Sequence, residues 1–150
     1  MTLDAALAIG HHFAAFAVLA TLGAEWALLR PGLDASDAGR IRKIDAVYGA
    51  AAGAVLVIGI ARLFGGIIDA SYYASNLFFW AKMTAFAALG LTSIGPTLRF
   101  GRWQRASAEN PRWTVPLEEL ALTRRAVILE LALFPLIPLC AALMARGFGS

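Results

Sequence analysis

Four ionisable side chains fall inside long apolar stretches of this chain, where an unpaired charge or imidazole is costly and is therefore a candidate for function. His11 and His12 lie side by side in the first stretch, Arg62 lies in the second and Lys82 in the third. By helical rise the histidines lie roughly 9–10 Å from one end of their stretch, and the two cations lie about one or two turns from the same end of theirs. We therefore expect these four side chains to gather at one depth.

Imidazole, guanidinium and ammonium groups together suit one chemical class of ligand. An imidazole nitrogen coordinates haem iron or chlorophyll magnesium, and Arg and Lys pair with the propionates at one edge of a porphyrin. The set predicts haem or a related tetrapyrrole, with His11 and His12 as the candidate metal ligands and Arg62 and Lys82 near the carboxylate edge. Covalent attachment is excluded, because the chain has no C-x-x-C-H motif.

A helical wheel separates the two histidines. Small residues from Gly10 onward mark the packed face of the first helix, and relative to Gly10 the side chain of His11 lies about 100° away and that of His12 about 200°. His11 is thus the predicted buried ligand, and His12 is expected to meet another helix, lipid or a partner subunit. Adjacent histidines cannot both face one metal, so a second axial ligand would come from Met83, Met144, Lys82, water or another chain.

Two other ligands remain open. Copper would use both histidines with Met144 and Cys140, which are soft or borderline ligands, although their spacing forms no recognised site. A quinone headgroup would be held by His11 together with Tyr48 or Trp80.

The elements that position these side chains are membrane-spanning helices. Of the 150 residues, 59% are hydrophobic and 15% are charged, with a mean hydropathy of +0.68, whereas soluble domains contain about 45–50% apolar and about 25% charged residues. Stretches long enough to cross about 30 Å of hydrocarbon occur at residues 5–29, 44–68, 78–98 and 125–145. The sequence therefore predicts an all-α polytopic membrane protein, with residues 1–150 forming a single transmembrane domain, an antiparallel bundle of four helices. We expect the first helix to be retained and not cleaved as a signal peptide.

The distribution of positive charge predicts the orientation. Ten Lys and Arg residues lie in the two loops that follow the first and third stretches, and Arg146 lies on the opposite side. Basic loops stay in the cytoplasm, so we expect a multi-pass protein of the bacterial inner (cytoplasmic) membrane with both termini periplasmic, N-out and C-out. The pI near 9.5 then indicates contact with anionic lipid headgroups and not with nucleic acid.

A second group of ionisable residues lies toward the cytoplasmic ends of the helices and comprises Glu25, Asp45 and Glu130. Arginines of the basic loops are within reach, so we expect structural ion pairs or snorkelling side chains. A proton path is the other interpretation.

Small residues and prolines predict how the helices pack. Gly49 and Gly53 form a G-x-x-x-G pair, which Gly59 nearly extends, and with the small residues that begin at Gly10 they predict close packing of the first two helices. Pro135 and Pro138 in the fourth helix, and Pro96 near the end of the third, are expected to kink or end their helices and open space between them.

Segments 3–12, 29–32, 42–50, 78–83 and 144–147 carry a family resemblance. They resemble a bacterial integral-membrane family of unknown function over essentially the whole chain. This family is distantly similar to the HemJ-type protoporphyrinogen oxidases and the CopD-like copper-resistance membrane proteins, which share a helix-one histidine and, in the HemJ type, a Trp-x-x-Lys-like element. The resemblance implies porphyrin chemistry and assigns cofactor binding to His11 or His12 and to Trp80 with Lys82. HemJ-type proteins carry a further histidine near that lysine, which this chain lacks.

Three functions follow from these observations. The first is haem or tetrapyrrole binding for electron transfer or porphyrin oxidation, as in a haem-dependent oxidoreductase. The alternative is a non-catalytic accessory or assembly subunit of a larger membrane complex, redox or photosynthetic, with the lipid bilayer and either a homo-oligomer or that complex as partners. A transporter ranks third, because four helices leave little room for alternating access and no inverted repeat is visible.

Overall fold

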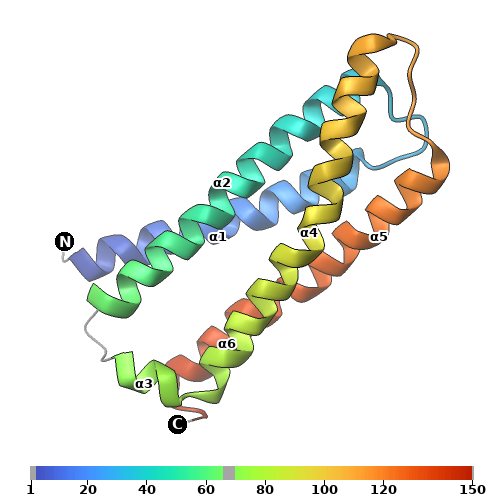
Figure 1. Ribbon diagram of the computed structural model, residues 1–150. Helices are drawn as coiled ribbons and strands as arrows, with labels where there is room; N and C mark the ends of the chain where they lie inside the picture. Colours follow the sequence, from blue (N-terminus) through green and yellow to red (C-terminus); the bar gives the residue numbers. More distant parts are fainter. Residues whose placement is uncertain (1–2, 66–69, 150) are drawn as a thin grey trace.

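The computed structural model describes residues 3–65 and 70–149, and this part of the chain is helical apart from short connections (Figure 1). Its helices are α1 (Leu3–Leu28), α2 (Ala35–Gly65), α3 (Ala70–Ser75), α4 (Leu77–Glu109), α5 (Leu117–Leu133) and α6 (Leu136–Ala145). By length and composition α1, α2, α4 and the continuous 117–145 stretch can each cross a membrane. The all-α polytopic architecture predicted from the sequence is therefore confirmed.

Three of the helices extend well beyond the predicted membrane spans. The second helix begins at Ala35 and not at residue 44, because the Asp34 carboxylate accepts a hydrogen bond from the Asp37 N–H at 3.0 Å and caps the first turn. The fourth span begins at Leu117 and not at 125, with Glu118 and Glu119 in its first turn, where acids favour the positive end of the helix. Residues 66–68 of the predicted second span lie outside the described residues.

Helix α4 was predicted to end near residue 98, and it instead continues through Pro96 to Glu109. The reason lies beyond the proline, where Phe100 is 0% exposed and Trp103 is 2% exposed. Burial of these two aromatic side chains favours continued helix over a break.

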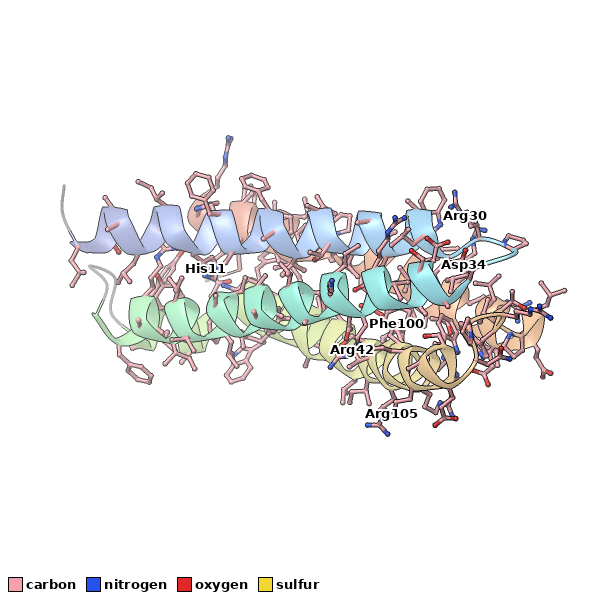
Figure 2. The ribbon with its side chains drawn as sticks, turned by 90° about the horizontal axis from the view of Figure 1, so that it is seen from above. His11, Arg30, Asp34, Arg42, Phe100 and Arg105 are labelled. Carbon is pink, nitrogen blue, oxygen red and sulfur yellow. The ribbon has the colours of Figure 1, made fainter. Side chains whose placement is uncertain are left out.

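The two connections predicted to be basic pack against each other at one end of the bundle, which we call the basic end. The Val115 N–H donates to the Leu33 carbonyl at 3.0 Å, and Leu33 is fully buried. Figure 2 shows Arg30, Arg42 and Arg105 at this end and His11 toward the other, which we call the histidine end.

The apolar core lies in the half of the bundle nearest the basic end. Val18 and Leu22 in α1, Leu89 in α4 and Val127 in α5 are almost completely buried, whereas α6 contributes no buried residue. Because Pro135 has no N–H to continue the hydrogen-bond ladder, α5 ends at Leu133 and α6 begins at Leu136.

The helices separate at the histidine end. Within the described residues, no Cα atom of α6 lies within 8 Å of one in α1 or α2, and Figure 1 shows the α1–α2 pair and the α4–α6 pair diverging there. Of the two prolines that were expected to open space between the helices, Pro138 lines the resulting cavity.

Helices α1 and α2 pack together along the bundle, but not through the predicted glycine pair. A Cβ atom built on Gly49 or Gly53 would meet nothing within 4 Å, so these glycines make no close helix contact and that prediction is wrong. The close contacts involve Gly10 and Gly59, which the packing prediction also named: a Cβ on Gly10 would lie 3.5 Å from Cδ1 of Ile58, and one on Gly59 would lie 3.4 Å from Cε1 of His11. A G-x-x-x-G spacing identifies a smooth helix face, and which neighbour covers that face depends on the whole bundle.

Candidate functional site

A cavity of about 780 Å³ lies in the half of the bundle nearest the histidine end, where α6 diverges from α1 and α2. It brings together His11, His12, Arg62 and Lys82, four of the five residues that the sequence analysis selected as a cofactor site. Their role stays a prediction, but their common depth and common cavity are features of the fold. Aromatic and apolar side chains from α1, α4, α6 and the turn before α6 form much of the remaining wall, among them Phe16, Phe79, Phe86, Phe134 and Ile137.

His11 lies between α1 and α2 (Figure 2), with its ring against the backbone of Gly59 and near that of Val55. The absence of a side chain at Gly59 leaves room for the imidazole. Its Nδ1 atom is buried and has no hydrogen-bond partner among the described residues. A buried ring nitrogen without a partner is costly, and this one is enclosed where His11 packs against α2.

His12 also lines the cavity, which the helical wheel did not indicate. Its Nδ1 atom lies 2.6 Å from the Ala8 carbonyl oxygen, and since a carbonyl can only accept, Nδ1 is the protonated nitrogen of the neutral ring. This assignment leaves the Nε2 lone pair free. A histidine that coordinates a metal through one ring nitrogen usually donates the N–H of the other ring nitrogen to a backbone carbonyl or a similar acceptor. This hydrogen bond fixes both the ring orientation and the tautomer.

Arg62 and Lys82 give the cavity a positive charge. Arg62 Nε is buried without a hydrogen-bond partner among the described residues, and Lys82 Nζ lies 5.3 Å from the centre of the Phe79 ring, within the range of a cation–π contact. None of the described residues that line the cavity is Asp or Glu. The cavity is therefore suited to a ligand that carries negative charge at one end and is apolar elsewhere.

Trp80, the fifth predicted residue, lies outside the cavity lining. Its indole N–H donates to the Ala74 carbonyl at 2.9 Å, and the residue is 56% exposed. Of the two methionines considered as second ligands, Met144 lines the cavity and Met83 does not. Of the four predicted copper ligands, His11, His12 and Met144 line the cavity and Cys140 does not.

The contacts that hold the histidine end of the cavity together were not predicted from the sequence. Tyr72 lines the cavity and its hydroxyl donates to the Met144 carbonyl at 3.0 Å. The Asn76 side-chain amide donates to the Phe148 carbonyl at 2.9 Å. Tyr72 lies in α3, and its contact with a residue 72 positions away has no local signature in the sequence.

The second predicted group of ionisable residues, near the basic end, divides in two. Asp45 forms the expected ion pair, with Arg42 Nη1 at 2.7 Å, and also accepts a hydrogen bond from the Thr97 hydroxyl at 2.6 Å. For Glu25 and Glu130 the ion-pair prediction is wrong, because neither has an ion pair within the described part of the chain. Both side chains are buried inside the bundle, and the arginine side chains of the loops form no ion pair with them there.

Fold and cavity together define the class: a polytopic membrane protein of four spanning helices with an internal cavity lined by histidine and cationic side chains. The chain belongs to the family described as "Predicted membrane protein (DUF2214)", whose model matches residues 3–149. This result confirms the assignment to a membrane family of unknown function. No curated protein and no solved structure matches the chain, and the more distant similarity to HemJ-type and CopD-like proteins stays a prediction.

Proposed function

We propose that the protein binds haem or a related tetrapyrrole in the cavity near the histidine end, for electron transfer or porphyrin oxidation. The observation that carries this proposal is the composition of the cavity: two imidazoles and two cations in an otherwise apolar and aromatic wall, with no acid among its described residues. A tetrapyrrole combines a metal, a flat apolar body and carboxylates at one edge, and each of these parts has a counterpart in the wall.

The cavity is a suitable size for such a ligand. Its volume of about 780 Å³ falls within the roughly 300–1,000 Å³ of pockets that enclose cofactors and drug-sized molecules. His12 offers a free Nε2 lone pair, Arg62 and Lys82 offer donors for the carboxylates, and Met144 is available on the opposite helix. When bound, the group would supply one-electron or porphyrin chemistry.

The residues of the chain then have separate tasks. The Ala8 carbonyl holds the His12 ring in one tautomer, which leaves Nε2 as the atom that would hold the metal. His11, held against Gly59, would pack its ring against the edge of the bound group. The aromatic wall excludes water, which strengthens the pairing of the two cations with carboxylates.

The proposal is tested by purifying the protein in its native lipid and recording oxidised and dithionite-reduced absorption spectra, with pyridine extraction and metal analysis. We expect a Soret band with near-stoichiometric iron or magnesium. His12→Ala should abolish the band, and His11→Ala should shift or weaken it. Arg146→Ala removes a cation at the same end of the bundle but outside the cavity lining, and it should leave the spectrum unchanged.

Two results would overturn the proposal. If both histidine variants keep an unaltered band, the ligand is bound elsewhere. If the protein is colourless and metal-free, and it migrates in constant ratio with a larger redox or photosynthetic complex, the chain is an accessory subunit.

A further inference from the structure

Two carboxylic acids are buried inside the half of the bundle nearest the basic end. Glu25 of α1 is 2% exposed and Glu130 of α5 is 1% exposed. Although many arginines lie at this end, the described residues include no cation paired with either acid. The arginines that form ion pairs have other partners: Arg42 pairs with Asp45, Arg30 and Arg40 with Asp37, and Arg102 with Glu119.

Tyr48 of α2 connects these acids. It is 4% exposed, and it lies close enough to Glu130, Glu25 and Ser93 to interact with them. The Tyr48 hydroxyl, one oxygen of Glu25 and one oxygen of Glu130 are all buried without a hydrogen bond of good geometry among the described residues. Asp45 is the charged residue that faces both acids, and it adds negative charge.

Two unpaired carboxylates and a third acid cannot all be ionised at low cost in such a setting. Ionised groups that are buried without a counter-charge are strongly disfavoured, and neighbouring carboxylates repel one another. Asp45 has its own counter-ion in Arg42. A proton held between Glu25 and Glu130 would neutralise part of the remaining charge and would give the orphaned oxygens a donor.

A groove leads to this cluster from the basic end. It has a volume of about 410 Å³ and runs between α2 and α4. Its polar wall starts at the Arg42–Asp45 pair with Thr97 and continues to Tyr48 and Ser93. Glycines at positions 49, 53 and 90 line the same groove, and a Cβ atom built on any of them would meet nothing within 4 Å, so the groove is open because these positions have no side chain.

The groove stops at an apolar partition. Phe86 and Leu89 line both this groove and the cavity near the histidine end, and Leu89 is 1% exposed. Polar access therefore runs from the basic end to Tyr48 and does not continue through the bundle.

We propose that Glu25, Glu130 and Tyr48 form a proton-exchange site, in which the two carboxyl groups hold a proton between them and exchange it with water at the basic end through the Tyr48 hydroxyl and the groove. The hydroxyl accepts a proton from Glu130 on its lone pair as it donates its own proton to a water molecule in the groove, and the reverse transfer returns a proton from water to Glu130, so water is the only other reactant. The site is defined without reference to the ligand of the cavity, so it can be tested whether or not the protein is coloured.

The experiment is infrared spectroscopy of the full protein in lipid bilayers at neutral pH, followed through exchange from H₂O to D₂O. A protonated carboxyl group has a C=O stretching band that carboxylates lack and that shifts on deuteration. We expect this band in the wild-type protein and its loss in Glu25→Gln and Glu130→Gln. Glu118→Gln, at an exposed position in the first turn of α5, should leave it unchanged. A wild-type protein without the band, or a band that survives both substitutions, would overturn the proposal.

The route is tested by filling the groove. Gly53→Leu places a side chain in open space and should slow deuteration of the band several-fold, whereas Gly23→Leu in α1, where a Cβ atom also meets nothing within 4 Å, should not. Tyr48→Phe keeps the ring and removes the hydroxyl, and it should shift the band and slow exchange even if the glutamine variants fail to fold. Wild-type exchange rates in both Gly53→Leu and Tyr48→Phe would rule out this route.

Discussion

A substitution at Gly59 should perturb the cavity near the histidine end selectively and leave the rest of the bundle unchanged. A Cβ atom there would lie 3.4 Å from Cε1 and 3.8 Å from Nδ1 of His11, which is ordinary van der Waals contact. Gly59→Ala should therefore be tolerated. Gly59→Leu extends further atoms toward the ring, so the imidazole must move or the two helices must separate.

The cost of the leucine can be worked from this geometry. Inserting carbon atoms into a packed contact typically costs about 1–3 kcal/mol. If that strain is expressed as displacement of His11 from its binding position, affinity falls by roughly 5- to 150-fold, because each 1.4 kcal/mol corresponds to about a factor of ten. Gly53→Leu is the matched control, since it makes the same change on the same helix in open space.

The assay is a titration of colourless protein in lipid nanodiscs with hemin, followed by the Soret difference spectrum. Gly59→Ala and Gly53→Leu should bind as the wild type does, and Gly59→Leu should bind within the weakened range. In the infrared exchange experiment the order is reversed, because Gly53→Leu should be slow and Gly59→Leu normal. If Gly59→Leu binds hemin as tightly as the wild type, or if Gly53→Leu loses as much affinity, our placement of the site against His11 is refuted.

Three further predictions concern packing, capping and charge. Leu22→Ala at a fully buried position should lower the free energy of unfolding, measured by SDS titration in detergent, by about 1–2 kcal/mol. The loss of packing contacts remains even though the leucine side chain is not transferred from water when a membrane protein folds. The control Val57→Ala, at a 66% exposed position, should have no measurable effect. Asp34→Ala removes the cap of α2 and should cost about 1 kcal/mol in the same titrations. Replacing Arg62 and Lys82 together by Gln should weaken hemin binding about 10- to 100-fold in the nanodisc titration, and unchanged binding would remove the carboxylate contacts from the proposal.

The number of helices was predictable because hydrocarbon thickness requires long apolar stretches, and this constraint is visible in composition alone. The ends of the helices were not predictable, because hydropathy identifies the membrane span and gives no information about helical residues outside it. Ala35 and Leu117 begin helices in polar sequence, where the first turn depends on the Asp34 cap and on acids at the positive end of the helix dipole. The extension of α4 to Glu109 depends on the burial of Phe100, which is a tertiary effect.

The gathering of His11, His12, Arg62 and Lys82 was predictable, because helical rise alone sets the depth of each residue. The direction in which each side chain points around the helix axis was harder to predict, because a histidine side chain is long enough to reach the cavity from more than one position on the helical wheel. His12 therefore lines the cavity despite lying about 200° from the reference face. Trp80 shares the right depth but turns its indole toward Ala74, and a local hydrogen bond of this kind has no sequence signature.

The break in the fourth span at Pro135 explains why the two halves of the molecule differ. Before Pro135, α5 keeps its place against α1 and α4, so Glu130 is enclosed among packed helices, near Tyr48 and Asp45. After Pro135, α6 leaves α1 and α2, and the space between them becomes the cavity with the histidines. Because Phe86 and Leu89 separate the cavity from the groove, a change in charge in the cavity would act on the acid cluster only through the field across this apolar layer. Such an arrangement allows electrons or ligands to be handled in one half and protons in the other, without an open path for ions across the membrane.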